Sequence, residues 1–165
     1  MPTLKLHRNP SFLNFGATLM PGDMHIRRTR LDDAEALAAL STQLGYPSDT
    51  QTMQQRLDVA VNSPEHAVYV CCDDDALHAW IHVMRTFHLE SGFGAEIAGL
   101  IVSERCRGQG LGSRLVRQAE DWAKSLGFDR LRVRCRAERT RAHAFYRNLG
   151  FEQEKMQHVF ILSLA

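Results

Sequence analysis

A glycine-rich segment between an apolar strand and an amphipathic helix constrains the fold of this chain more than any other feature. It follows the apolar stretch 95–102 and reads Arg107-Gly108-Gln109-Gly110-Leu111-Gly112-Ser113. Apolar residues then recur at helical spacing at positions 111, 115, 119, 122, 123 and 126, and Gly127 is placed to end that helix. A strand, a glycine loop and a helix in this order indicate an α/β domain.

The rest of the chain adds strands and helices on both sides of this segment. Strands are predicted at 25–30, 67–72, 76–87, 95–102, 131–136 and 158–164. Helices are predicted at 32–44, 48–61, 111–126 and 142–149, with capping signals of Asp32 and Glu35 for the first and Ser48 and Gln51 for the second. Strand 76–87 alternates but has no fully polar face, so we expect it to be covered on both sides. The order β-α-α-β-β-β-α-β-α-β predicts one mixed α/β (α+β) domain.

Length and composition fit a single soluble domain. The chain has 165 residues, of which 44% are hydrophobic and 24% charged. No run of 18 apolar residues occurs, so we expect no membrane span. The N-terminus lacks a basic start followed by a continuous apolar stretch, so we expect no signal peptide. The four cysteines form no CxxC pair, which favours a reduced, cytoplasmic protein. We expect 1–23 to be an N-terminal extension, disordered or an annotation artefact, and 24–165 to be the domain.

Charge is divided unevenly along the chain. Residues 1–104 contain 7 Lys/Arg and 13 Asp/Glu, a balance of −6, whereas residues 105–165 contain 13 and 6, a balance of +7. A basic C-terminal part suits a phosphate-rich ligand, and an acidic N-terminal part suits a cationic one. Solvated arginines distributed by chance are the alternative that composition leaves open.

The glycine segment has the properties of an anion site. Glycines let the backbone turn tightly and approach a ligand, and the free N–H groups at the start of the following helix suit a pyrophosphate. A Walker A loop needs Gly-Lys-Ser/Thr, which is missing, and a Rossmann fingerprint needs G-x-G-x-x-G near the first strand. Here the glycines stand at 108, 110 and 112, late in the chain. An ordinary glycine turn and an unrelated phosphate-binding α/β protein are the alternatives.

Two motifs resemble the GNAT superfamily of N-acetyltransferases. Arg107-x-x-Gly110-x-Gly112 resembles its Q/R-x-x-G-x-G/A acetyl-CoA signature. The segment 141–151 resembles its A-x-x-F-Y-x-x-x-G-F segment, with Phe145 and Tyr146 as the F-Y pair. The resemblance covers about residues 24–164. It implies a splayed mixed β-sheet flanked by helices, and an enzyme that moves the acetyl group of acetyl-CoA to a primary amine of a small molecule or peptide.

The resemblance also implies a set of contacts to acetyl-CoA. The cosubstrate would lie in the cleft between the fourth and fifth strands, where the backbone of Leu100, Ile101 and Val102 would pair with the pantetheine arm. The pyrophosphate would be held by amides of Arg107, Gly108, Gln109, Gly110, Leu111, Gly112 and Ser113. Many members carry Asn at the position of Arg139. We therefore expect Arg139 or Arg141 to meet a phosphate instead, with a solvated arginine as the alternative.

Acetyl transfer to an amine also needs an acid and a base. The amine has to be neutral when it attacks, and the CoA thiolate has to be protonated as it leaves. Tyr146 is the candidate acid because it matches the Tyr of the family's F-Y pair, and a core aromatic is the alternative. Glu96 is the candidate base because Ala95-Glu96-Ile97 resembles the A-E-I of members in which the Glu acts through water. A carboxylate that only binds the amine is the alternative, and Glu90 and His88 are weaker candidates.

Other chemistries have less support in the sequence. His78 and His82 share a strand face, but no third ligand has metal-site spacing, so we expect no metal. Cys106 lies beside the loop, and we treat it as structural because direct transfer needs no protein nucleophile. The arginines of 130–136 have no interleaved aromatics, so we expect no nucleic acid partner.

The expected function is N-acetyl transfer by direct attack in a ternary complex. A catalytically silent CoA-binding sensor or interaction module of the same fold is the alternative, which would bind the cosubstrate without turnover. The expected partner is an amine acceptor that the sequence does not identify, and a homodimer is left open.

Overall fold

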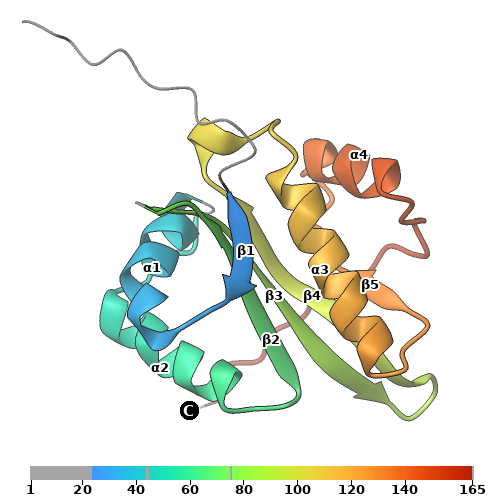
Figure 1. The fold of residues 1–165 in the computed structure, drawn as a ribbon. Helices are drawn as coiled ribbons and strands as arrows, with labels where there is room; N and C mark the ends of the chain where they lie inside the picture. The colour runs from blue at the N-terminus through green and yellow to red at the C-terminus, as the bar shows by residue number, and fades with distance from the viewer. Residues whose placement is uncertain (1–23, 44, 75, 165) are drawn as a thin grey trace, which may run out of the picture.

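A mixed five-stranded β-sheet is the centre of the structure, a computed structural model that describes residues 24–43, 45–74 and 76–164. Its strands are β1 (His25–Arg28), β2 (His66–Cys72), β3 (Leu77–His88), β4 (Gly92–Val102) and β5 (Leu131–Val133). They lie in the order β1-β2-β3-β4-β5, and all neighbours are antiparallel except β4 and β5, which are parallel (Figure 1). The predicted fold class is confirmed, whereas the extension predicted for 1–23 lies outside the described residues.

Helices cover both faces of this sheet (Figure 1). α1 (Ala34–Gln43) and α2 (Thr50–Val61) lie on one face, where Leu57 packs with Val68 and Val70 of β2. α3 (Leu111–Ser125) lies on the other face, and α4 (Thr140–Asn148) joins the same apolar core. We call these the α1/α2 face and the α3 face. No helix within the described ranges is long and apolar enough to cross a membrane.

β3 is covered on both sides, as its mixed alternation predicts. Ala79, Ile81 and Val83 are fully buried on the α3 face. Trp80, one residue out of phase with them, packs into the cluster on the α1/α2 face. The strand therefore forms the middle of a three-layer arrangement, and it fixes the position of its neighbour β4 on one side and β2 on the other.

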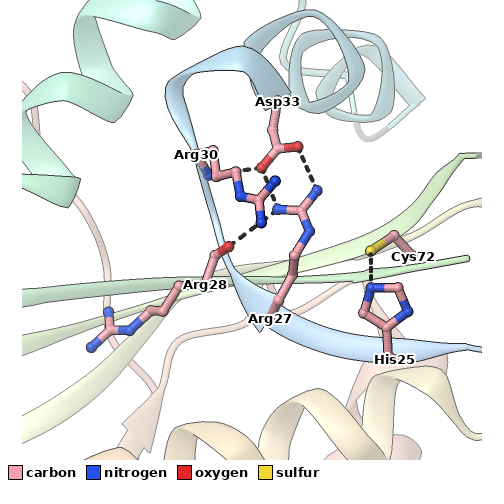
Figure 2. Close-up of polar contacts among 6 residues, drawn as sticks. All are labelled: His25, Arg27, Arg28, Arg30, Asp33 and Cys72. Carbon is pink, nitrogen blue, oxygen red and sulfur yellow. Dashed lines mark hydrogen bonds and ion pairs between the residues drawn. The ribbon is translucent and has the colours of Figure 1, made fainter. Parts of the chain in front are cut away.

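The start of α1 is set by Asp33, and the predicted cap at Asp32 with Glu35 is wrong. A short 3₁₀ turn (Leu31–Asp33) precedes the helix, and Asp33 accepts the backbone N–H of Arg30 at 2.8 Å. Figure 2 shows why Asp33 takes this position: the Arg27 guanidinium donates to both of its oxygens at 2.7 and 2.8 Å. This bidentate pair between β1 and the turn fixes the carboxylate, which local sequence cannot show.

The start of α2 differs from the prediction by one residue. Asp49, and not Ser48, is the N-cap, and its side chain accepts the backbone N–H of Thr52 at 2.7 Å. The Thr52 hydroxyl also donates to the same carboxylate at 2.8 Å. A carboxylate that accepts two hydrogen bonds and faces the positive end of the helix is a stronger cap than the neighbouring hydroxyl.

The C-terminal strand predicted at 158–164 is not formed, and β5 is shorter than the predicted 131–136. Residues 149–164 contain no helix or strand. No strand pairs with the outer edge of β5 in the part of the chain that the structure describes. A strand is defined by a hydrogen-bonded neighbour, so the apolar alternation of 158–164 does not produce one where the segment lies away from the sheet.

Candidate active site

A β-bulge in β4 marks the place where β4 and β5 part. His82 pairs with Gly99 and Val83 with Ile97, so Ala98 is an extra residue in β4. β5 pairs with β4 only at Ala95, Glu96 and Ile97, which lie immediately before the bulge. From Ala98 to Val102 the edge of β4 that faces β5 has no neighbouring strand among the described residues. The bulge therefore lies where the two strands part, which is where the resemblance places the acetyl-CoA cleft.

The free edge of β4 carries the three residues predicted to pair with the pantetheine arm. Leu100 and Val102 are half-buried and pack against the core on the α3 face, and Ile101 is buried. One backbone acceptor is already used, because the Val102 carbonyl accepts a hydrogen bond from Nε of Arg107 at 3.3 Å. Peptide groups on this edge are otherwise placed to receive an extended, amide-bearing ligand in the manner of an added strand.

The glycine loop meets the geometric requirements of an anion site at the start of α3. Gly108 and Gly110 have φ of +79° and +81°, a region that L side chains rarely adopt. A Cβ at either position would meet no atom within 4 Å, so the backbone borders open space. Gly110 is the N-cap of α3, and no side chain caps this helix end. Its first N–H groups are therefore left for a ligand anion.

Of the remaining loop residues, Leu111 and Gly112 pack in the core, whereas Gln109 and Ser113 lie nearer the surface. Leu111 is buried in the core, and a Cβ on Gly112 would lie 3.2 Å from the Phe145 ring of α4. Gly112 therefore allows α3 and α4 to approach closely. The Gln109 side chain donates to the Arg105 carbonyl at 3.2 Å, and Ser113 is half-buried in the first turn of α3.

Two predicted phosphate contacts, Arg107 and Arg139, are exposed. Arg107 forms an ion pair with Glu104 at 3.3 Å, and its side chain is 40% exposed. Arg139 is the N-cap of α4 and is exposed, as is Arg141 two residues further on. Neither Arg139 nor Arg141 forms an ion pair with any residue that the structure describes. Both side chains are available to an anion.

Tyr146 packs in the core, and its hydroxyl has no hydrogen-bond partner among the described residues. It is 9% exposed and makes edge contacts with the rings of Phe145 and Phe151, at centroid distances of 5.0 and 5.3 Å. Burial raises the pKa of Tyr146 above its ordinary value, and the nearby Cys135 adds to this effect. The phenol therefore remains protonated at neutral pH. Among the described groups, none hydrogen-bonds its hydroxyl.

Glu96 lies at the closed end of the cleft. It is 9% exposed and stands between Met84 of β3 and Arg132 of β5 in the sheet register. Its Oε2 lies 3.1 Å from Nη2 of Arg134, an ion pair that is not aligned as a hydrogen bond. Ala95 and Ile97 on either side of it face the α3 core, so alternation places the Glu96 side chain on the α1/α2 face.

Tyr146 and Glu96 therefore lie on opposite faces of the sheet. Tyr146 belongs to the core on the α3 face, and Glu96 lies on the α1/α2 face beside the last paired residues of β4 and β5. The weaker candidates lie elsewhere, since His88 ends β3 and the exposed Glu90 is in the β3–β4 turn.

The two histidines that share a face of β3 have different partners and do not form a metal site. His78 Nε2 lies 2.7 Å from Asp73, and its Nδ1 lies 3.6 Å from the Cys106 sulfur. His82 Nε2 lies 3.0 Å from Nδ1 of His66. No group of three or more potential ligands is placed to hold a metal within the described ranges.

Asp73, His78 and Cys106 contact one another in series and have the composition of a nucleophilic triad, but the Cys106 sulfur is buried from solvent. Cys106 is 2% exposed and belongs to the core on the α3 face. The arrangement links the β2–β3 turn to the start of the glycine loop. Sequence reasoning missed it because the three residues are 5 and 28 positions apart and follow no periodicity.

A contact that sequence reasoning also missed joins the connection between α1 and α2 to the segment after β5. Arg136, which follows β5, donates to the Tyr46 hydroxyl at 2.8 Å, and its guanidinium lies 5.5 Å from the centre of the Tyr46 ring. Tyr46 belongs to the connection between α1 and α2 and is 55% exposed. The contact therefore ties the α1/α2 face to the strand that borders the cleft.

Comparison with known proteins identifies the family. The Acetyltransferase (GNAT) family matches residues 32–151. The chain is 28% identical over 144 residues to an aminoglycoside N(6')-acetyltransferase type 1 of Stenotrophomonas maltophilia, covering 84% of this chain and 93% of that protein. It is 28% identical over 116 residues to the uncharacterized N-acetyltransferase YhdJ of Bacillus subtilis, covering 70% and 82%.

Solved structures share the fold. The aminoglycoside antibiotic 6'-N-acetyltransferase AAC(6')-Ih from Acinetobacter baumannii superposes with a TM-score of 0.76 at 19% identity, covering 86% of this chain and 99% of that one. The glucosamine-6-phosphate N-acetyltransferase from Arabidopsis thaliana gives 0.72 at 21% identity, covering 85% and 99%. The family match spans well over half of the sequence, so this chain belongs to the GNAT acetyltransferase family and is an N-acetyltransferase.

Proposed function

We propose that this enzyme transfers the acetyl group of acetyl-CoA to a primary amine of a small, multiply charged cationic molecule, by direct attack in a ternary complex. The observation that carries the proposal is the parting of β4 and β5 directly after Ile97, with the glycine loop at one end and Glu96 at the other. An anion site and a buried carboxylate at opposite ends of one cleft suit a cosubstrate with phosphates and an acceptor with a positive charge.

Acetyl-CoA is expected to bind with its phosphates at the start of α3. Gly108 and Gly110 leave open space where side chains would stand, which supports close approach of a pyrophosphate to the backbone. Arg139 and Arg141 are exposed at the N-terminal end of α4, and we expect one of them to meet a further phosphate. The pantetheine arm then lies along residues 98–102 of β4 and brings the thioester to the place where β4 and β5 part.

Proton transfer is assigned to Glu96 and Tyr146, which lie on opposite faces of the sheet. Glu96, which is paired with Arg134, accepts the proton of the ammonium directly or through a water. The amine nitrogen then attacks the thioester carbon, the carbon–sulfur bond breaks, and the Tyr146 hydroxyl gives its proton to the sulfur. Burial keeps Tyr146 protonated until that moment. The new amide nitrogen loses its extra proton to solvent, and solvent returns a proton to the Tyr146 oxygen. Direct transfer uses no protein nucleophile, consistent with the buried position of Cys106.

An aminoglycoside-like polyamine is the acceptor class we favour. Two of the similar proteins are named as aminoglycoside acetyltransferases, and the first 104 residues carry a balance of −6. An acidic cavity of about 510 Å³ on the α1/α2 side is lined by Asp32, Asp33, Asp73 and Asp74 among others. This cavity does not include β4 or β5 residues, so it is a place for a distal charge of a large acceptor and not for the reacting amine.

A panel of amines with acetyl-CoA tests the proposal, with free CoA measured by a thiol reagent. We expect turnover with aminoglycosides above that with spermidine, glucosamine 6-phosphate or a peptide N-terminus. Glu96→Gln and Tyr146→Phe should abolish most of this turnover while both variants still bind acetyl-CoA in a calorimeter. Tight acetyl-CoA binding without turnover on any cationic amine would contradict the proposed acceptor class.

A further inference from the structure

The two faces of β3 differ in how completely they are covered. On the α3 face, the side chains between Ala79 and Val83 are fully buried. On the α1/α2 face three side chains are only half-buried: Trp80, His82 and Met84. Met84 is the register partner of Glu96 on β4, and the Glu96 side chain lies on this same face. An acceptor that approaches Glu96 from the α1/α2 face therefore meets these half-buried side chains.

The Trp80 ring extends across the neighbouring strand β4 at Gly99. A Cβ on Gly99 would lie 2.9 Å from both Cη2 and Cζ3 of the indole, which is closer than such atoms approach in proteins. No other glycine among the described residues would bring its Cβ so close to a neighbouring atom. The φ of Gly99 lies outside the left-handed region, so its backbone conformation does not require glycine. The space that the indole occupies therefore explains why position 99 has no side chain.

This contact lies beside the bulge of β4. Gly99 directly follows Ala98, the extra residue of the bulge, and β5 pairs with β4 only up to Ile97. The indole therefore covers the α1/α2 face of β4 just beyond the point where β4 and β5 part. Glu96 lies on the same face, three positions before Gly99. The carboxylate and the indole are thus placed on one face of β4, on either side of the bulge.

The surface that Trp80 leaves open is apolar. Its Nε1 atom is buried and has no hydrogen-bond partner among the described residues. Its backbone lies in the middle of the sheet, between Val70 of β2 and Ile101 of β4. The open part of this half-buried residue is therefore ring carbon. Burying an indole N–H without an acceptor is unfavourable, and a phenylalanine at this position would avoid that cost.

We propose that the Trp80 indole is the platform on which the acceptor ring lies, and that it selects cyclic amines over linear ones. The inference rests on the proposed function, because it assigns a residue to the acceptor side of the same cleft. A sugar ring has C–H groups on its flat face and amino groups at its edge, so it can lie on the indole while an amine reaches Glu96. An ammonium group near the indole face adds electrostatic attraction. A linear polyamine has no flat face to place on the ring.

Tryptophan fluorescence tests this contact without turnover. The chain has two tryptophans, and Trp122 is buried in the core on the α3 face. Trp122→Phe therefore leaves Trp80 as the only tryptophan emitter. Kanamycin, a cyclic amine, should change the emission of this variant saturably in the presence of CoA, and the linear amine spermidine should change it much less. An emission that stays constant at kanamycin concentrations that saturate turnover would overturn the platform.

Substitution of Trp80 separates the platform from a structural role. Trp80→Ala should raise the KM for kanamycin by roughly tenfold, whereas acetyl-CoA affinity and the KM for spermidine should change little. Trp80→Phe keeps an aromatic ring and should restore most of the kanamycin KM. Equal losses for the two amines would overturn the selection and leave the proposed transfer standing. Kanamycin bound at Trp80 without turnover of any amine would support the platform and contradict the proposed function.

Two glycines of β4 provide a matched pair of variants. Gly99→Ala places a Cβ against the indole and should displace the ring, so the kanamycin KM should rise as it does in Trp80→Ala. Gly94→Ala adds the same atom to the same strand, but its nearest neighbour would be Thr86 Oγ1 at 3.7 Å, an ordinary contact, and the KM should not change. Calorimetry with acetyl-CoA shows that both variants are folded. An equal kanamycin KM in the two variants would overturn the role of the ring.

Discussion

Arg134 and Glu96 form an ion pair where β4 and β5 part. The Glu96 residue is nine-tenths buried, whereas the Arg134 side chain is largely exposed. The Arg134 Nη2 and Glu96 Oε2 atoms are 3.1 Å apart, and the arginine side chain is 60% exposed. The contact is not aligned as a hydrogen bond, so this buried oxygen has no hydrogen-bond partner in the described part of the chain. The ion pair therefore leaves this oxygen able to accept a hydrogen bond from a water or an ammonium.

Replacing Glu96 tests its role as a base. Glu96→Gln keeps the shape of the side chain but cannot accept the amine proton. We expect kcat/KM to fall at neutral pH and to recover at high pH, where the free amine is already neutral. Steady-state rates between pH 6 and pH 10 measure this recovery. The variant Glu90→Gln is the control, because Glu90 lies exposed in the β3–β4 turn.

A purely electrostatic role of Glu96 gives a different result. If the carboxylate only holds the cationic amine, Glu96→Gln should mainly raise the acceptor KM and high pH should bring no recovery. Equal pH profiles of kcat/KM and an equal acceptor KM for the parent and the variant would show that Glu96 takes no part in the reaction.

Removing the hydroxyl of Tyr146 tests the acid. Tyr146→Phe preserves the ring contacts with Phe145 and Phe151, so the fold and acetyl-CoA affinity should persist. We expect kcat to fall by roughly 10²–10⁴-fold, the range of proton-transfer catalysis. Because burial raises the pKa of Tyr146 above its ordinary value, the parent kcat should show no loss from phenol ionisation up to about pH 10. An unchanged kcat in the variant would make Tyr146 a core residue only.

The order of elements and the glycine loop were predictable because they depend on local patterns. Helical spacing from Leu111 to Trp122 and the turns at Gly108 and Gly110 are properties of neighbouring residues. The helix starts were less predictable, since Asp33 is held by Arg27 from another element. The absent strand at 158–164 follows the same rule: its pattern is correct for a strand, but pairing depends on a distant edge.

The candidate site was predictable in its residues and not in its geometry. Glu96 and Tyr146 were found through a resemblance, but their places on opposite faces depend on β-sheet alternation and on a core built from strands and helices far apart in the sequence. The bulge at Ala98 has no signal in the sequence, because an extra residue in one strand is defined only by its partner strand. The contact of Tyr46 with Arg136 joins residues 90 positions apart.

The partly buried pair of His66 and His82 predicts a loss of stability in mild acid. Burial and the neighbouring His66 lower the pKa of His82 from 6.5 to about 4. The unfolded chain takes up a proton at this residue below pH 6.5 and the folded protein does not, so the free energy of unfolding should fall as pH decreases from 6.5 to 4. The difference corresponds to at most about 3 kcal/mol. Urea unfolding at several pH values measures it.

Substitution of His82 isolates this contribution. His82→Gln retains a polar partner for His66 but cannot titrate, so its unfolding free energy should vary less between pH 6.5 and pH 4. His158→Gln, in the exposed C-terminal segment, should keep the pH dependence of the unfolding free energy that the parent protein shows. Identical slopes for the parent and His82→Gln would contradict the assignment.

The two ends of α3 offer a matched pair of glycines for testing the anion site. Gly110 precedes the helix and Gly127 follows it, with φ of +81° and +78°, and a Cβ at either position would meet no atom within 4 Å. Gly110→Val and Gly127→Val should therefore each cost a similar backbone strain, of about 1–2 kcal/mol or somewhat more. Only Gly110→Val fills the space at the helix N-terminus, so calorimetry should show acetyl-CoA binding lost in that variant and retained in Gly127→Val. Equal affinities in the two variants would place the phosphates elsewhere.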